Sequence, residues 1–315
     1  MISDRDHEQF ETDGYVVVKG LLNVETDIQP VLDEYEGVLN QLVDLLYDKG
    51  ELSTRYEDLN FGERLTKVYA ECGAQSQFFD FSLPQADVQS DTPFWAGPAV
   101  FDMLRNKKLL EAVETFVGPE IYSVPVQHIR IKPPEHMIGE KRDNKVIQTP
   151  WHQDSGVILP EADESNILTV WFPLTDASME QGCLEVLPGS HKMGLKHHCW
   201  VPIGLEARGV DFGPSIPLPM QAGDVLFMHS LTCHGSLRNV SDKVRISFDL
   251  RYSPIGHPTG RPAFPGFVVQ SQKDSEAELH DPKVWENMWR ETRDRLAREE
   301  NRPFNRWSVD DPTCA

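Results

Sequence analysis

The segment from Tyr122 to Tyr252 is the part of the chain that most constrains its fold. It consists of short apolar runs punctuated by glycine and proline. Such runs, bounded by turn-forming residues, are typical of the strands of an antiparallel β-barrel or sandwich. The flanking segments differ, because over residues 24–48, 109–116 and 281–300 the apolar residues recur at helical spacing. In the first of these helices, one side is formed by Leu32, Tyr35, Val38, Leu39, Leu42 and Leu45. The sequence therefore predicts an α+β fold in which helices flank an antiparallel barrel or sandwich.

The length of the chain is compatible with a single barrel domain of 315 residues. We expect one domain over residues 1–315. It would have a helical N-terminal part over about 1–120, a barrel core over about 121–255, and a C-terminal loop and helix over 256–315.

Two flanking segments have more than one interpretation. The apolar stripe of the C-terminal helix is expected to pack on the body of the protein, with a homodimer contact through Trp285 and Trp289 as the alternative. The polar loop 135–149 is either a lid over a site or a solvated surface loop. The sequence does not decide between these interpretations.

The balance of charge excludes two classes of partner. The chain carries 50 acidic and 30 basic residues, a formal net charge of −20. Nucleic acid and anionic membranes both require positive protein surface, so neither is expected as a partner. There is no N-terminal apolar run and no apolar span of about 18 residues, which argues against secretion and membrane insertion. We expect a cytoplasmic protein.

The cysteines give no sign of a disulfide scaffold or a zinc ribbon. Their number is odd and none stand in a Cys-x-x-Cys spacing. They are Cys72, Cys183, Cys199, Cys233 and Cys314. Nor do the adjacent His197 and His198 suggest a zinc site, because neighbouring side chains on a strand diverge. We expect these two histidines at the surface or at the rim of a site.

The stretch Thr149-Pro-Trp-His-Gln-Asp-Ser-Gly156 contains a histidine and a carboxylate two residues apart. On a strand, His152 and Asp154 point to the same face, because strand side chains alternate. One histidine from a distant strand would complete a 2-His-1-carboxylate set, which holds non-haem Fe(II) and leaves part of the metal open. On its own, a His-x-Asp motif is a weak signal.

A second motif downstream supplies that histidine. Gly223-Asp224 indicates a turn, and the apolar residues 225–227 indicate a buried strand. His234 follows, with Arg245 eleven residues beyond it. Arginine suits bidentate capture of a carboxylate, so a metal histidine followed by this arginine fits a chelating dicarboxylate. Of the two histidines here, His234 is preferred to His229 because only it precedes Gly-Ser at this distance from the arginine.

With these motifs, the chain resembles the phytanoyl-CoA dioxygenase family of Fe(II)/2-oxoglutarate oxygenases. Further blocks at residues 10–18, 131–134 and 182–191 resemble the opening helix and strand, the strand before the iron motif, and a mid-barrel turn of that family. The resemblance implies a double-stranded β-helix, that is, a jelly-roll or cupin-like barrel. It also implies Fe(II) held by His152, Asp154 and His234, with O₂ and 2-oxoglutarate as cosubstrates and succinate and CO₂ as co-products.

The resemblance also implies roles for further residues. Those expected at the 2-oxoglutarate are Arg245, Ser236, Trp171, Thr169, His128 and Gln153, with a plain packed histidine as the alternative for His128. Those expected at the primary substrate are Trp151, Arg130 and Trp200. If Arg245 faces inward on its strand, then Ser247, Asp249 and Arg251 do so too, and we expect Arg251 to pair with Asp249 or another buried charge.

The expected activity is hydroxylation of a small organic substrate, such as a natural-product or lipid-like metabolite. Desaturation, cyclisation and endoperoxide formation use the same iron and remain alternatives, whereas halogenases of this kind lack the carboxylate that Asp154 supplies. Two other classes stay open: a catalytically inactive cupin-like binding protein, and a Zn or Mn hydrolase on a similar barrel. The hydrolase would have no need of Arg245.

Overall fold

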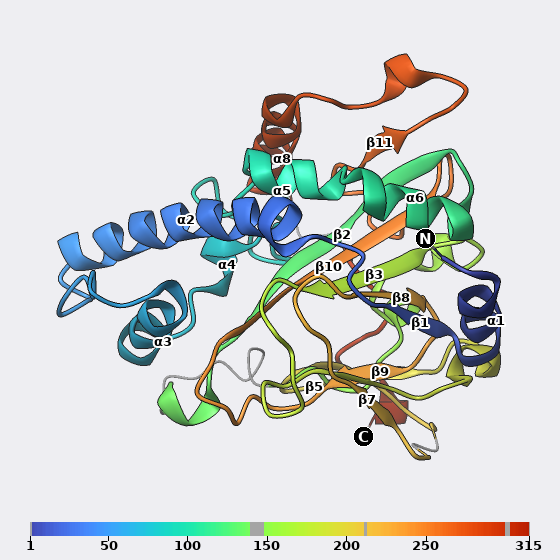
Figure 1. The fold of residues 1–315 in the computed structure, drawn as a ribbon, viewed down its shortest axis with the longest axis horizontal. Coiled ribbons are helices and arrows are strands. Elements are labelled where there is room, and N and C mark those ends of the chain that lie inside the picture. Colours follow the sequence, from blue (N-terminus) through green and yellow to red (C-terminus); the bar gives the residue numbers. More distant parts are fainter. Residues whose placement is uncertain (1, 139–147, 211–212, 300–302, 315) are drawn as a thin grey trace.

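The computed structural model describes residues 2–138, 148–210, 213–299 and 303–314, and it combines helices with antiparallel sheets (Figure 1). The larger sheet has the strand order β1-β8-β3-β10-β2-β11. Its strands are β1 (Tyr15–Val18), β8 (Val225–His229), β3 (Leu168–Pro173), β10 (Arg245–Pro254), β2 (Ile121–Lys132) and β11 (Phe267–Gln270).

A smaller sheet of order β7-β4-β9 lies on one side of the larger one (Figure 1). It consists of β7 (Ile216–Leu218), β4 (Leu184–Val186) and β9 (His234–Ser236), and a separate hairpin is formed by β5 (His198–Val201) and β6 (Gly204–Ala207). A cluster of apolar side chains drawn from both sheets occupies part of the space between them, among them Trp171, Leu184, Leu218 and Leu226. The described strands form two facing open sheets, in which no closed barrel is traced.

The helices cover the outer face of the larger sheet (Figure 1). They are α1 (Asp4–Asp13), α2 (Gln29–Asp48), α3 (Phe61–Cys72), α4 (Ser76–Phe79), α5 (Pro98–Leu104), α6 (Lys107–Val117) and α8 (Pro282–Leu296). The helix expected over 24–48 is divided: a π-helical turn spans Val24–Ile28, and α2 begins after it with Pro30 in its first turn. Proline is favoured there because the first N–H groups of a helix have no intrahelical partner.

The buried face of α2 follows the predicted stripe through Tyr35, Val38, Leu39 and Leu42. The stripe ends there, because Leu45 is 43% exposed and the buried positions of the last turns are Val43 and Leu46. Including Leu45 in that stripe was therefore wrong.

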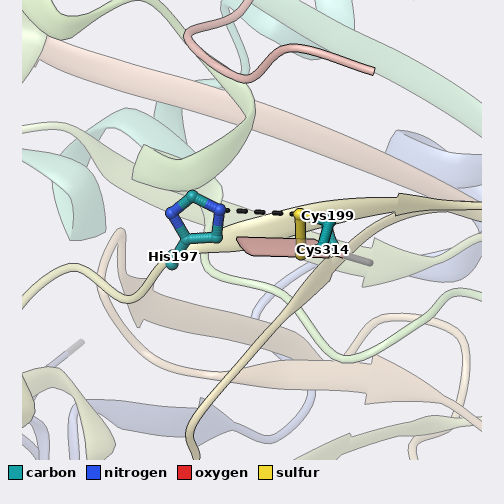
Figure 2. Close-up of side chains that lie close together, drawn as sticks. All are labelled: His197, Cys199 and Cys314. Atoms are coloured by element: carbon teal, nitrogen blue, oxygen red, sulfur yellow. Dashed lines mark hydrogen bonds between the residues drawn. A yellow bond between two sulfur atoms is a disulfide. The ribbon is translucent and has the colours of Figure 1, made fainter. Parts of the chain in front are cut away.

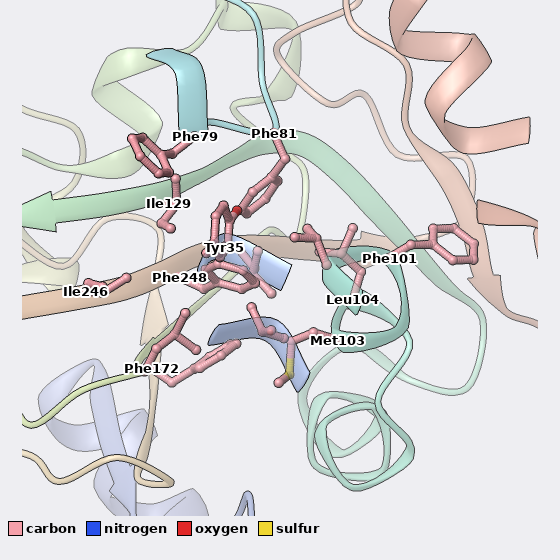
Figure 3. Packing of buried hydrophobic residues seen from close by; sticks show 14 of the residues in the cluster. Tyr35, Phe79, Phe81, Phe101, Met103, Leu104, Ile129, Phe172, Ile246 and Phe248 are labelled. Atoms are coloured by element: carbon pink, nitrogen blue, oxygen red, sulfur yellow. The ribbon is translucent and has the colours of Figure 1, made fainter. Parts of the chain in front are cut away.

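Phe248 lies at the centre of the core between α2 and the larger sheet (Figure 3). Its ring centroid is 4.8 Å from that of Phe81, 5.7 Å from that of Phe172 and 6.2 Å from that of Tyr35. We expect Phe248→Ala to lower the free energy of unfolding by about 3–5 kcal/mol, because the cavity is walled by other rings that cannot collapse into it. Urea denaturation of the metal-free protein measures this change, and a loss under about 1 kcal/mol would show a core that repacks.

Strand β10 confirms the predicted alternation of its side chains. Phe248 and its neighbours of the same parity, Ile246, Leu250 and Tyr252, are buried in the core under the helices. Arg245, Ser247, Asp249 and Arg251 point to the opposite face, toward the smaller sheet, where their polar contacts lie. The larger sheet thus separates an apolar core from a polar interior.

Helix α8 packs on the body, as predicted. Trp285 and Trp289 are fully buried in their own chain, against Phe101 and Phe264 respectively. The alternative in which these two tryptophans form a homodimer contact is therefore wrong. Of the predicted lid loop 135–149, residues 139–147 lie outside the described residues. None of the helices in the described ranges is long and apolar enough to cross a membrane.

Candidate metal centre and anion pocket

Three side chains from distant parts of the sequence meet between the two sheets. The candidate ligand atoms of His152, Asp154 and His234 all lie within 4.8 Å of one another. Nε2 of His152 is 3.7 Å from Asp154 Oδ1, and Nε2 of His234 is 4.0 Å from the same atom. The two histidines face each other across a single antiparallel bridge, in which each backbone N–H donates to the other's carbonyl at 2.9 Å. His229, the other candidate, is not in this group.

A backbone carbonyl fixes the outer nitrogen of each imidazole. Nδ1 of His152 lies 2.9 Å from the carbonyl oxygen of Pro150, and Nδ1 of His234 lies 3.0 Å from that of Thr232. Because a carbonyl only accepts, each Nδ1 carries the proton and each Nε2 has its lone pair free. Burial lowers the pKa of His234 to about 4, so this ring is neutral at pH 7. Two imidazoles and one carboxylate are the donor set of a non-haem Fe(II) site.

Asp154 is not on a strand, contrary to the expectation. The bridge at His152 is isolated, and the 3₁₀ turn Asp154–Val157 begins at the carboxylate itself. The N–H of Gly156 donates to the carbonyl of Gln153 and closes this turn. The strand-alternation argument was therefore wrong about the local structure, although the two side chains do converge.

The carboxylate of Asp154 is held by side chains of the larger sheet. Thr169 Oγ1 donates to Oδ2, and Arg251 donates to Oδ1 at 2.6 Å. Arg251 also contacts Asp249 at 2.8 Å, as predicted for a buried pairing. Burial alone would raise the pKa of Asp154, but the guanidinium of Arg251 and the two histidines hold the pKa well below its usual value. Thr169, expected at the cosubstrate, contacts the candidate metal ligand instead.

A second polar group surrounds Arg245 at the start of β10. Arg245 is buried, donates to Ser247 Oγ at 2.6 Å, and its Nε has no hydrogen-bond partner in the described structure. Lys132 pairs with Arg245 across β2 and β10, is also buried, and donates to Ser236 Oγ at 2.7 Å. Ser236 also accepts the N–H of Thr149 at 2.9 Å.

Burial makes both of these cations costly. Burial, and then the charge of Arg245, lower the pKa of Lys132 well below its usual value. Burial, and then the charge of Arg130, lower the pKa of Arg245 to about 10. Within the described part of the chain, no ion pair joins Lys132 or Arg245 to a carboxylate. Two buried like charges without an acid form a site for an anion.

Lys132 was missed in the sequence. The signal was present, because it has the same parity on β2 as His128 and Arg130, which were both expected at the site. It also lies inside the block 131–134 that carries the family resemblance. The side chain of a lysine in a strand is ordinarily expected to be exposed to solvent. Here its position opposite Arg245 shows that it lies on the interior face of the sheet.

The remaining residues predicted at the cosubstrate divide into two groups. Trp171 lies with the anion pocket, its ring centre 5.5 Å from the guanidinium carbon of Arg245. His128 is engaged elsewhere, because its Nδ1 is 2.8 Å from Asp80 Oδ2. Gln153 is fully buried, and its amide donates to two backbone carbonyls and accepts one backbone N–H. This geometry does not support the cosubstrate contact predicted for Gln153.

The residues predicted at the primary substrate lie in three different parts of the structure. Arg130 has a side chain that is 52% exposed and lies 3.7 Å from Asp249. Trp151 packs on the apolar cluster that contains Cys233. Trp200 is 40% exposed. Their role at a substrate remains a prediction.

A small hollow adjoins Asp154 and Arg251. Besides those two residues, it is lined by Val124, Val126, Ile158, Ile167 and Ser230. Its wall is therefore largely apolar next to the candidate metal ligand.

The C-terminal tail lies against the turn that carries Asp154. Trp307 Nε1 donates to the carbonyl of Gly156 at 2.5 Å, and its ring stacks on His198 at 5.6 Å. His198 is fully buried and accepts the N–H of Gln153 at 3.0 Å, so of its two expected positions the surface is wrong, while it does lie beside the candidate site. Gly156 permits this approach, because a Cβ there would lie 2.3 Å from the His198 ring.

The tail is joined to β5 by a disulfide. Cys199 and Cys314 are bonded across 115 residues, with their Cα atoms 5.5 Å apart. The number and pattern of the cysteines argued against a disulfide scaffold, which one bond does not form, but they did not predict this pair. Their spacing in the sequence carried no signal, because only the path of the tail brings them together.

The chain is similar to known proteins over most of its length. The family model described as phytanoyl-CoA dioxygenase (PhyH) matches residues 10–247. The peroxisomal phytanoyl-CoA dioxygenase of Rattus norvegicus is 25% identical over 260 residues, covering 80% of this chain and 68% of that protein. The 1-deoxypentalenic acid 11-beta-hydroxylase of Streptomyces arenae is 36% identical over 172 residues, covering 50% of this chain and 58% of that protein.

The fold is also shared with a solved structure that contains the expected ligands. The epimerase SnoN, in complex with Fe³⁺, α-ketoglutarate and nogalamycin RO, is 19% identical with a TM-score of 0.54. The match covers 89% of this chain and 92% of that one. The chain belongs to the phytanoyl-CoA dioxygenase family of iron- and 2-oxoglutarate-dependent oxygenases.

Proposed function

We propose that His152, Asp154 and His234 hold Fe(II) and that 2-oxoglutarate binds between this centre and the pair Arg245 and Lys132. The reaction proposed is hydroxylation of a small organic substrate, with succinate and CO₂ as co-products. The observation that carries the proposal is a buried cluster of two histidines and one carboxylate, near two buried cations with no acidic partner in the described chain.

The three proposed ligands leave part of the metal open. An Fe(II) bound by three residues retains positions for a bidentate 2-oxo acid and for O₂, and it supplies the oxygen chemistry of the reaction. The surrounding residues of the chain hold the three ligand side chains in position. The carbonyls of Pro150 and Thr232 orient the two imidazoles, and Thr169 and Arg251 orient the carboxylate.

The distance between the centre and the anion pocket suits a short dicarboxylate. Ser236 lies two residues after His234 on β9, about 6.6 Å along a strand, and shares its face. Lys132 contacts Ser236, and Arg245 lies beside Lys132. A carboxylate placed here would receive the free Nε–H of Arg245 and neutralise both cations.

The hollow beside Asp154 is about the size of one water molecule, so it does not itself hold a substrate. Its largely apolar wall supports only that the surroundings of the candidate metal ligand suit hydrocarbon. The chain's net charge of −20 disfavours a polyanionic substrate. Hydroxylation is proposed because the Streptomyces arenae relative is a named hydroxylase, while the fold alone is shared with an epimerase and does not decide the reaction.

We also propose that the two facing sheets represent the double-stranded β-helix of the family. The three candidate ligands and the anion pocket would then lie between its two halves, within one domain over residues 1–315. The antiparallel pairing of all the described strands and the polar inward face of β10 support this assignment.

An anaerobic titration tests the proposal. Fe(II) and then 2-oxoglutarate are added to metal-free protein, and the visible charge-transfer absorption of an iron-chelated 2-oxo acid is recorded. We expect the band in the wild type and in His229→Ala, a control that removes a nearby histidine outside the cluster. We expect no band in His152→Ala.

Two results would contradict the proposal. Iron that binds without the band would exclude 2-oxoglutarate chelation at this centre. A band followed by no succinate when O₂ is admitted, with a broad panel of apolar carboxylic acids and terpenoids present, would favour the inactive binding protein.

A further inference from the structure

Apart from the candidate iron centre, the described residues contain one other close group of metal-ligating side chains (Figure 2). The ligand atoms of His197, Cys199 and Cys314 lie within 4.8 Å of one another. Nε2 of His197 is 3.6 Å from Cys314 Sγ and 3.2 Å from Asp311 Oδ2. The same nitrogen also contacts Thr313 Oγ1 at 2.9 Å. One nitrogen and two sulfurs therefore lie close together, and a carboxylate oxygen lies beside the nitrogen.

The backbone explains why these four side chains meet. His197 and Cys199 stand two residues apart where the chain enters β5, so their side chains share a face. Asp311 and Cys314 stand three residues apart around the 3₁₀ turn Pro312–Cys314, and side chains at this spacing in such a turn lie one above the other. Each segment thus offers a pair of ligands to the other, in the pattern of a site that joins two segments through one ion.

We propose that, in the reduced protein, His197, Cys199, Asp311 and Cys314 form a binding site for Zn²⁺ or a similar thiophilic divalent ion. Zinc prefers four tetrahedral ligands from imidazole, thiolate and carboxylate, at about 2.0–2.3 Å, which places neighbouring ligand atoms about 3.3–3.8 Å apart. The distances from His197 Nε2 to Cys314 Sγ and to Asp311 Oδ2 are close to this range before any ion is bound.

The disulfide and the metal site are two exclusive states of the same residues. Dithiothreitol reduces the Cys199–Cys314 bond by two electrons and two protons, and is itself oxidised to its cyclic disulfide. The two thiols then lose two protons as Zn²⁺ binds their thiolates. In the absence of metal, oxidised glutathione takes up the two electrons and two protons, becomes two thiols, and restores the sulfur–sulfur bond.

The two states have the same structural consequence. Both the disulfide and the metal site would hold residues 311–314 against β5. The tail that leads to these residues contains Trp307, which contacts Gly156 and His198. Arg306 adds an ion pair with Asp163 at 2.5 Å. The site is chemically separate from the iron centre, because His152, Asp154 and His234 offer no sulfur.

Cobalt(II) distinguishes the two sites, because only a thiolate ligand gives an intense sulfur-to-cobalt charge-transfer band in the near ultraviolet. The full chain is reduced with dithiothreitol, freed of reductant and metal under nitrogen, and titrated with Co²⁺. We expect the band to saturate at one equivalent in the wild type and in Cys72→Ser. We expect Cys199→Ser and Cys314→Ser to lose most of it, and His197→Ala to weaken Co²⁺ binding at the thiolate site by tenfold or more.

Thiol protection gives a second readout. Zn²⁺ is expected to slow the alkylation of Cys199 and Cys314 at least tenfold and to leave the rate at Cys72 unchanged. Replacement of Cys314, the second-last residue, removes no core side chain, and circular dichroism verifies the fold of each variant.

The proposal is overturned if the reduced wild type shows no sulfur-to-cobalt band, or if the band survives in both cysteine variants. The pair would then be a disulfide only. The result does not depend on the proposed iron ligands, because His152→Ala is expected to retain the full band. Failure of the iron assignment and failure of the zinc site are therefore distinguishable.

Discussion

His152→Ala is expected to abolish turnover, by at least about a thousandfold, while leaving the metal-free protein nearly as stable as the wild type. In the proposed centre the ring contributes a ligand nitrogen, and its truncation leaves no buried charge behind. Its own side chain is 12% exposed and its Nδ1 bonds only a carbonyl, so the free energy of unfolding should change by less than about 1 kcal/mol.

Asp154→Ala is expected to be equally inactive but clearly less stable. Its removal deprives the buried Arg251 of one of two carboxylates, and breaking a buried pair costs about 3–5 kcal/mol. We expect the free energy of unfolding to fall by about 3 kcal/mol, the lower end of that range, because Asp249 still contacts the guanidinium of Arg251. Thr169 also loses its hydrogen-bond acceptor.

Urea denaturation of the metal-free variants separates these two effects. The double variant Asp154→Ala/Arg251→Met should recover part of the stability without recovering activity, because the partly unpaired guanidinium is removed and Asp249 keeps its contact with Arg130. Equal stability of the two single variants would show that Arg251 does not depend on Asp154. Near-native turnover in either single variant would refute the assignment of the iron ligands.

The elements with regular side-chain periodicity were predictable from the sequence. The alternation along β10 placed Arg245 and Arg251 on the interior face and Phe248 in the apolar core, and both placements are confirmed. The helical stripe of α2 was predicted apart from its last turn, where Leu45 is exposed. Periodicity works here because one face of each element is buried throughout its length.

The predictions from the sequence failed where a single residue contacts a partner that is distant along the chain. Asp154 sits in a 3₁₀ turn, because the ladder between His152 and His234 is only one residue long. The pairing of Cys199 with Cys314 depends on the path of the tail, which no periodic pattern records. Burial of Lys132 depends on its neighbour across the sheet. Such contacts are set by tertiary packing, which a local pattern does not encode.

Arg245→Met is expected to weaken the binding of 2-oxoglutarate far more than the binding of Fe(II) or of the primary substrate. Truncating one partner of a buried, hydrogen-bonded charge pair costs about 2–5 kcal/mol, which is about 30-fold to several-thousand-fold in Kd. Methionine retains an apolar stem of similar length, so the packing on Trp171 is largely kept. The charge-transfer band, titrated with 2-oxoglutarate at fixed Fe(II), measures this Kd directly. Arg208→Met, an exposed arginine that contacts Glu206, is the matched control.

Lys132→Met decides whether the anion pocket uses one cation or two. If Lys132 and Arg245 both face the carboxylate of 2-oxoglutarate that is far from the metal, this variant should raise the Kd for 2-oxoglutarate by about tenfold or more. A tenfold change in Kd corresponds to roughly 1.4 kcal/mol of binding free energy. The metal-free protein should lose little stability, because the ammonium that is removed lies buried beside the like charge of Arg245. The opposite outcome, a large loss of stability with an unchanged Kd, would make Lys132 a structural link to Ser236 and Leu237. The recognition of 2-oxoglutarate would then rest on Arg245 alone, with Ser247 and Trp171 as its supports.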